Sequence, residues 1–227
     1  PAAQPEPVTK SAPRWLQLDR EYQIAAALFY AGSYDQAVKA FDAIAATSDC
    51  QWRQIAPSLA ARTIIRSATT AQKYREPLDD QKLTEADSRL NKILRNPLEP
   101  EFRKDVERLL QFVQIRTRPA AALEQIERRL TTRVMPESIG QDVTDFWVAY
   151  QKGDGVNAPG PFSRWLTAMR SGADFSAAFA EWRASGSLPW LVVALQEAES
   201  EPTAELNELL TDAAKVPVKS PAYLTAR

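Results

Sequence analysis

The chain has 227 residues, of which 44% are hydrophobic and 25% are charged, the balance of a folded globular protein. Its formal net charge of -1 offers no general attraction for nucleic acid, and its longest apolar stretch, residues 190–195, is far shorter than the roughly 20 residues that span a bilayer. Histidine is absent and cysteine occurs once, at Cys50, which excludes histidine-based catalysis, internal disulfides and cysteine-based zinc clusters.

The first part of the chain is predicted to be a leader followed by three helix hairpins. Residues 1–16 are rich in proline and alanine and are expected to be flexible. Apolar residues then recur at helical spacing over residues 18–45, with a break at Gly32, and this pattern predicts two antiparallel helices. Two further pairs follow, residues 52–71 with 83–94 and residues 102–115 with 119–130. Residues 17–135 are therefore interpreted as one array of hairpins.

Residues 136–227 are predicted to continue the helical array in a less regular form. A helix over residues 138–150 is followed by the turn-forming segment 153–161, which we expect to be a flexible joint. Four short helices are then predicted near residues 162–170, 174–184, 188–199 and 203–214, and residues 217–227 are expected to open another helix. We expect the array to be truncated there, so that further chain or another subunit covers its end.

The first hairpin resembles the tetratricopeptide repeat (TPR), which places small residues where its two helices meet and a large apolar residue late in the second helix. The matching residues are Ile24, Ala25, Leu28, Gly32, Tyr34, Ala37, Phe41 and Ile44. The resemblance covers residues 18–96, with an insertion between the two helices of the second repeat. In the third pair, Val106 departs from the family pattern. It implies an all-α fold, a right-handed superhelix of antiparallel helix hairpins, or α-α solenoid.

A TPR-like superhelix also implies a concave wall, formed by the first helix of each pair, that holds a peptide from another protein. Tyrosine and arginine are common at such interfaces. The alternative for Tyr22, Phe29 and Tyr30 is that they pack against the next hairpin. The candidate peptide-binding residues on this wall are Asp19, Tyr22, Phe29, Tyr30 and Arg53.

Other clusters in the sequence are interpreted as structural. Acidic groups such as Asp79 with Asp80 and Asp142 with Asp145 lack supporting ligands or a proton partner. The glycines of residues 153–160 are not followed by the lysine and hydroxyl residues of a phosphate-binding loop. Residues 196–214 carry six acids and no base, a charge run that either steers a partner or keeps an outer helix face solvated. We predict no catalytic residue, no cofactor site and no metal site.

The sequence is therefore interpreted as a helical-repeat scaffold or adaptor that binds another protein or peptide and is not an enzyme. We expect no nucleic-acid partner and no membrane insertion. As a whole the chain is also similar to divergent helical-repeat proteins of the bacterial cell envelope, which implies the periplasm or envelope more than the cytoplasm. Two alternatives stay open: a non-catalytic superhelical domain of a peptidoglycan-acting envelope enzyme, and a structural subunit that assembles as a homo-oligomer.

Overall fold

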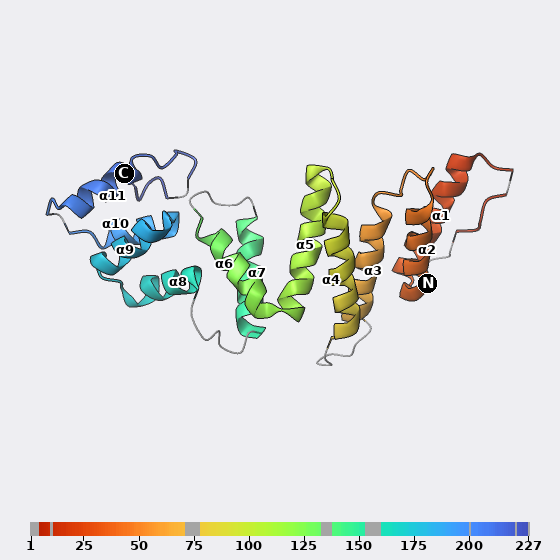
Figure 1. The fold of residues 1–227 in the computed structure, drawn as a ribbon, viewed down its shortest axis with the longest axis horizontal. Helices are drawn as coiled ribbons and strands as arrows, with labels where there is room; N and C mark the ends of the chain where they lie inside the picture. Colours follow the sequence, from red (N-terminus) through yellow and green to blue (C-terminus); the bar gives the residue numbers. More distant parts are fainter. Residues whose placement is uncertain are drawn as a thin grey trace. The chain divides into compact units, whose positions relative to one another are not determined.

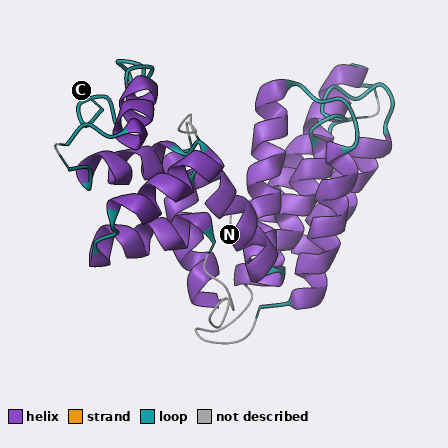
Figure 2. Cartoon of the chain, turned by 60° about the vertical axis from the view of Figure 1, so that its left-hand side comes forward, coloured by secondary structure: helices purple, strands orange, loops and turns teal. Residues whose placement is uncertain are grey.

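The computed structural model describes residues 5–9, 11–70, 78–132, 138–152, 160–199, 201–220 and 222–226. Within these residues the chain forms eleven α-helices and no strand (Figure 2). The predicted all-α class is confirmed. The chain divides into two compact units, Pro1–Thr117 with helices α1 to α5 and Arg118–Arg227 with helices α6 to α11 (Figure 1).

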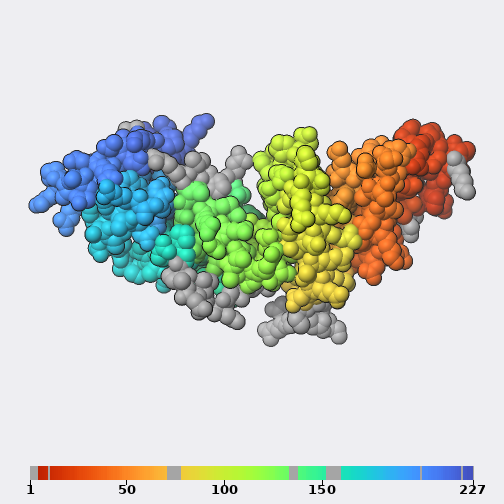
Figure 3. Space-filling model, in the orientation of Figure 1, coloured from red at the N-terminus to blue at the C-terminus, as the bar shows by residue number. Residues whose placement is uncertain are grey.

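The first unit is a row of five helices, each packed against the next in chain order. They are α1 (Arg14–Tyr30), α2 (Tyr34–Ala46), α3 (Ala56–Thr70), α4 (Asp80–Leu94) and α5 (Pro100–Thr117). Packing joins α1 with α2, α2 with α3, α3 with α4 and α4 with α5, and α3 also touches α5. In the space-filling view these helices follow one another as bands from red to yellow-green (Figure 3). Each helix of this unit therefore contacts mainly its neighbours in sequence.

The first hairpin is held together by close packing of small residues. Ala25 on α1 and Ala37 on α2 are both fully buried, which lets the two helix backbones approach closely. Gly32 has φ +78°, a left-handed conformation that most side chains disfavour, and the Ser33 amide donates to the Leu28 carbonyl at 2.9 Å across the turn. These contacts agree with the packing that the sequence predicts for residues 18–45.

Helix α4 begins at an acidic cap. Asp79 is the N-cap residue, and its side chain accepts a hydrogen bond from the Lys82 amide at 3.0 Å. Replacing Asp79 with alanine is expected to destabilise the first unit by about 1 kcal/mol, because an orphan amide of the first turn loses its acceptor. Hydrogen exchange of the Lys82 amide measures this. Asp79→Asn keeps an acceptor and serves as the control, and an equal loss in both variants would contradict the capping role.

The second unit contains six shorter helices. They are α6 (Pro119–Leu130), α7 (Ile139–Lys152), α8 (Pro161–Ser171), α9 (Phe175–Ser185), α10 (Leu188–Gln196) and α11 (Ala204–Ala213). Helix α6 packs mainly against α7 and also touches α8, while α10 packs against α8, α9 and α11. Trp182 and Trp190 are buried in the core around α10, whereas Trp147 on α7 is about half exposed. The indole rings of Trp182 and Trp190 therefore stabilise the core of this unit.

Three expectations about segment pairing and boundaries need correction. The predicted third hairpin joined residues 102–115 with 119–130, but the border between the two units falls between these helices, and α6 is paired with α7. Helix α3 begins at Ala56 and not at Trp52, since residues 51–55 form turns. The predicted helix at the end of the chain is also wrong. Its described residues 217–220 and 222–226 contain turns, and Ala222 packs onto the core of the second unit.

Some expectations concern residues outside this description. The predicted boundary between residues 135 and 136 lies outside the described residues, as does most of the predicted joint at 153–161. In the predicted leader, the Glu6 carbonyl accepts a hydrogen bond from Arg20 of α1 at 2.7 Å, so this part lies against the first helix. Among the described helices, none has the length and apolar character needed to cross a bilayer.

Candidate functional site

A groove of about 380 Å³ lies in the first unit where α1, α3 and α5 meet the start of α2. We call it the α1–α3–α5 groove. Its volume is within the usual range for small ligand sites and accommodates one or two side chains of a bound peptide. Its lining residues are Phe29, Tyr30, Tyr34, Arg62, Ile65, Arg66, Thr69, Leu109 and Phe112.

Aromatic rings from α1 and α2 form one side of this groove. The centroid of the Phe29 ring is 5.1 Å from that of Tyr30 and 6.2 Å from that of Tyr34, both in edge-to-face arrangements. The tight turn at Gly32 brings the end of α1 and the start of α2 together, so that Tyr30 and Tyr34 both line the groove. Tyr30 is 81% exposed, which makes its ring available for contact with a partner.

Two arginines of α3 are the charged residues that line the groove. Arg62 and Arg66 are both exposed and stand one helical turn apart. Within the described residues, neither guanidinium has a carboxylate within 4.0 Å. Helix α3 contains no acidic residue, so this like-charged pair has no opposite charge on its own helix. Such a pair destabilises a helix by a few tenths of a kcal/mol, about 0.2 to 0.5.

Other arginines of the same unit are paired with carboxylates. Arg89 donates to Asp42 at 2.8 Å, and this hydrogen bond is the main cause of the raised pKa of its guanidinium. Arg14 donates to Asp49 at 2.8 Å, with the same effect on its pKa. The first unit thus contains carboxylates that pair with arginines, but neither Asp42 nor Asp49 lines the groove.

The far side of the groove is an apolar surface with a further basic group beside it. Leu109 and Phe112 of α5 line it, together with the buried Ile65 of α3. The Arg116 guanidinium lies over the Phe112 ring, 3.4 Å from its centroid, and donates to the Phe112 carbonyl at 2.7 Å. A cation over an aromatic face is favourable and holds the ring in position. The groove therefore combines aromatic and aliphatic surface with positive charge.

Two of the five predicted site residues line this groove, Phe29 and Tyr30. Asp19 and Tyr22 are engaged with Trp52 instead: the Asp19 carboxylate accepts from the indole N–H at 2.8 Å, and the Tyr22 ring stacks on the indole at 4.4 Å. The packing alternative for Tyr22 is thus the one observed. Arg53 is exposed on the turn before α3 and is not among the residues that line the groove.

Sequence reasoning missed Arg62 and Arg66 on α3 and Phe112 on α5. A signal for the arginines exists in the sequence, because residues 50–75 contain five basic residues and no acidic one. Such a run is uncommon in a chain whose charges are otherwise balanced. Phe112 lies on the apolar stripe of its helix, and only the packing of α5 beside α3 brings it to the groove.

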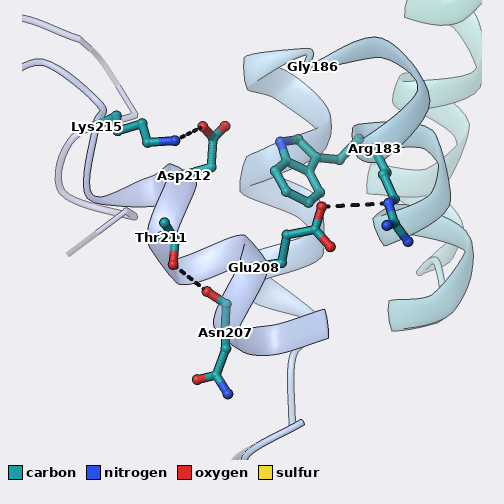
Figure 4. Close-up of a pocket in the computed structure, with 8 residues that line it drawn as sticks. Arg183, Gly186, Asn207, Glu208, Thr211, Asp212 and Lys215 are labelled. Carbon is teal, nitrogen blue, oxygen red and sulfur yellow. Dashed lines mark hydrogen bonds and ion pairs between the residues drawn. The ribbon is translucent and has the colours of Figure 1, made fainter. Parts of the chain in front are cut away.

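A second pocket, of about 550 Å³, lies in the second unit between α9 and α11 (Figure 4). Its charged side chains pair with one another: Arg183 with Glu208 at 3.6 Å and Lys215 with Asp212 at 3.4 Å (Figure 4). The Trp182 ring, which also lines it, is buried. Because its charges are mutually neutralised, this pocket offers less selectivity for a charged partner than the α1–α3–α5 groove.

Asp142, one of the acidic residues that the sequence singles out, has a structural role. Asp142 is buried and accepts hydrogen bonds from Arg129 at 2.8 Å and from Ser138 at 2.9 Å, so it stabilises the start of α7. No group of three or more acidic or cysteine side chains in the described part of the chain is arranged to hold a metal ion. Cys50 is buried.

Comparison of the chain with protein-family models, with curated proteins and with solved structures finds no match. The TPR resemblance stays a prediction.

Proposed function

We propose that this chain is a helical-repeat scaffold that binds another polypeptide through the α1–α3–α5 groove and is not itself an enzyme. The observation that carries this proposal is which helices supply the residues that line the groove. They come mainly from alternate helices, α1, α3 and α5: α1 and α3 are the first helices of the two hairpins of this unit, and α5 follows the second hairpin. In a superhelix of antiparallel hairpins these helices line the concave wall.

The packing of the first unit supports a TPR-like array of helix hairpins. Helices α1 to α5 each pack against the next one along the chain, and α3 also touches α5, two helices further on. Packing limited to near neighbours is typical of repeat proteins. The buried alanines of the first hairpin are those that the TPR pattern requires to be small.

The composition of the groove supports a protein partner. Tyrosine and arginine dominate the binding energy of many protein interfaces, because they combine large contact area with directed polar groups. Tyr30 has an exposed ring at the groove, and Arg62 and Arg66 offer hydrogen-bond donors. A peptide lying across alternate helices would bury these side chains together.

Capture from an extract of the source organism tests this function. The full chain, Tyr30→Ala and Trp15→Ala are each immobilised, and bound proteins are quantified by mass spectrometry. Trp15 is a suitable control because it is a 60% exposed aromatic on the same helix but outside the groove. We expect one protein to be retained by the parent and by Trp15→Ala and to be reduced at least tenfold with Tyr30→Ala.

Circular dichroism of the same proteins separates binding from folding. Because Tyr30 is largely exposed, its removal is expected to leave the helix content unchanged. A parallel loss of helicity would remove Tyr30 from the binding site. Retention of polysaccharide without any protein would instead favour the domain of an envelope enzyme.

A further inference from the structure

We infer that the partner segment in the α1–α3–α5 groove is acidic, with carboxylates at alternate positions of an extended peptide and an apolar side chain beside them. This inference rests on the proposed function of the groove and adds the chemistry of the partner. The occupant is a segment of another protein, recognised through Arg62, Arg66 and the neighbouring rings.

Charge complementarity indicates that the bound segment is negatively charged. Both charged residues that line the groove are arginines, and no described carboxylate neutralises them. The two guanidinium groups repel each other, so a bound anion relieves an unfavourable interaction and gains two charge-assisted hydrogen bonds. A basic segment would add to this repulsion, and a neutral one would leave both arginines unpaired.

The spacing of the arginines gives the pattern of the partner. Residues one helical turn apart have Cβ atoms about 5 to 6 Å apart. In an extended peptide, residues two positions apart lie about 6.6 Å apart and on the same side, from a rise of about 3.3 Å per residue. Carboxylates at alternate positions therefore match Arg62 and Arg66 of α3.

The aromatic surface gives the third element of the partner. Tyr30 and Phe29 on one side and Leu109 and Phe112 on the other leave an apolar space beside the arginines. A leucine-sized side chain buries apolar area there and adds to the charge contacts, which alone are weak at an exposed site. We therefore expect both the charges and the apolar residue to be required.

Fluorescence anisotropy with synthetic peptides tests the inference on the full chain. The probe is a labelled ten-residue peptide in which glutamate alternates with alanine around one central leucine. Matched peptides replace every glutamate with glutamine or with lysine. In 50 mM salt we expect the glutamate peptide to bind at least tenfold more tightly than the glutamine peptide. We also expect this preference to shrink at 500 mM salt, since ions screen exposed charges.

Charge-matched variants assign the preference to the groove. The double variant Arg62→Gln with Arg66→Gln is expected to lose at least tenfold in affinity for the glutamate peptide. The control is Arg53→Gln with Arg95→Gln, which removes two exposed arginines outside the groove and is expected to bind within twofold of the parent. Equal losses in the two double variants would show a general charge effect and overturn the inference.

The remaining outcomes separate this inference from the proposed function. If glutamate and glutamine peptides bind equally and Tyr30→Ala weakens both, the groove binds peptides and only the acidic preference is wrong. If no peptide binds and Tyr30→Ala captures the same proteins as the parent, both proposals fail.

Salt-sensitive self-association of the chain that is lost in the Arg62→Gln, Arg66→Gln variant would identify a second copy as the occupant, and would overturn the assignment to another protein. The exposed Glu197, Glu199 and Glu201 are its acidic candidates.

Discussion

Replacing Phe41 with alanine is expected to lower the free energy of unfolding of the first unit by about 3 to 5 kcal/mol. Phe41 is 3% exposed and lies in the core shared by α1, α2 and α3. Its ring packs edge-on against Tyr22, with centroids 6.3 Å apart. The helices cannot close the resulting cavity, because Ala25 and Ala37 already hold α1 and α2 in contact.

Hydrogen exchange of the α2 amides in the full chain measures this loss, because it reports on the first unit separately from the second. Phe41→Leu fills more of the space and is expected to lose less than the alanine variant. Trp15→Ala is the surface control, with an expected change within about 0.5 kcal/mol. A loss below 1 kcal/mol in Phe41→Ala would contradict the buried position of this ring.

The helices were largely predictable from the sequence because their periodicity is a local property. Apolar residues at helical spacing located α1, α2 and α4, and proline at the first position located α6. The start of α3 was misplaced because Trp52, although apolar, serves as a packing partner for Tyr22 on a turn. Local pattern describes which residues are apolar but does not distinguish a turn residue from the first turn of a helix.

Pairing between helices was less predictable, since it depends on packing between distant residues. The predicted helices at residues 102–115 and 119–130 were interpreted as a hairpin, yet α6 packs against α7. The apolar stripe of α6, with Leu123, Ile126 and Leu130, is buried in the second unit. Sequence spacing shows that such a stripe exists and leaves open which neighbour covers it.

The candidate site was predictable only in its aromatic part. Phe29 and Tyr30 followed from the expected wall of first helices, and both line the groove. Asp19 satisfied the same rule but is engaged by Trp52. Arg62 and Arg66 look like ordinary exposed positions of an amphipathic helix, and their importance depends on the absence of a pairing carboxylate among the residues that the structure describes.

Replacing Gly160 with alanine is expected to destabilise the second unit by about 2 to 3 kcal/mol, through overpacking and a weaker helix cap. Gly160 is the N-cap of α8, and a Cβ there would overlap the carboxylate of Glu127 on α6. Glu127 is 1% exposed and accepts a hydrogen bond from Ser163, so moving its carboxylate away from Gly160 would disturb a buried contact. Urea unfolding followed by tryptophan fluorescence measures the loss, because Trp147, Trp165, Trp182 and Trp190 lie in this unit.

A double-mutant cycle separates the two causes. With Glu127→Ala as background, the overlap is gone, and Gly160→Ala is expected to cost only about 1 kcal/mol or less from the cap. Glu127→Gln keeps the size of the side chain and removes its charge, so a large cost of Gly160→Ala should persist in that background. If Gly160→Ala has the same cost in all three backgrounds, the cap alone explains it, and Glu127 does not pack against this turn. If the cost disappears in Glu127→Gln as well, the coupling is electrostatic and not steric.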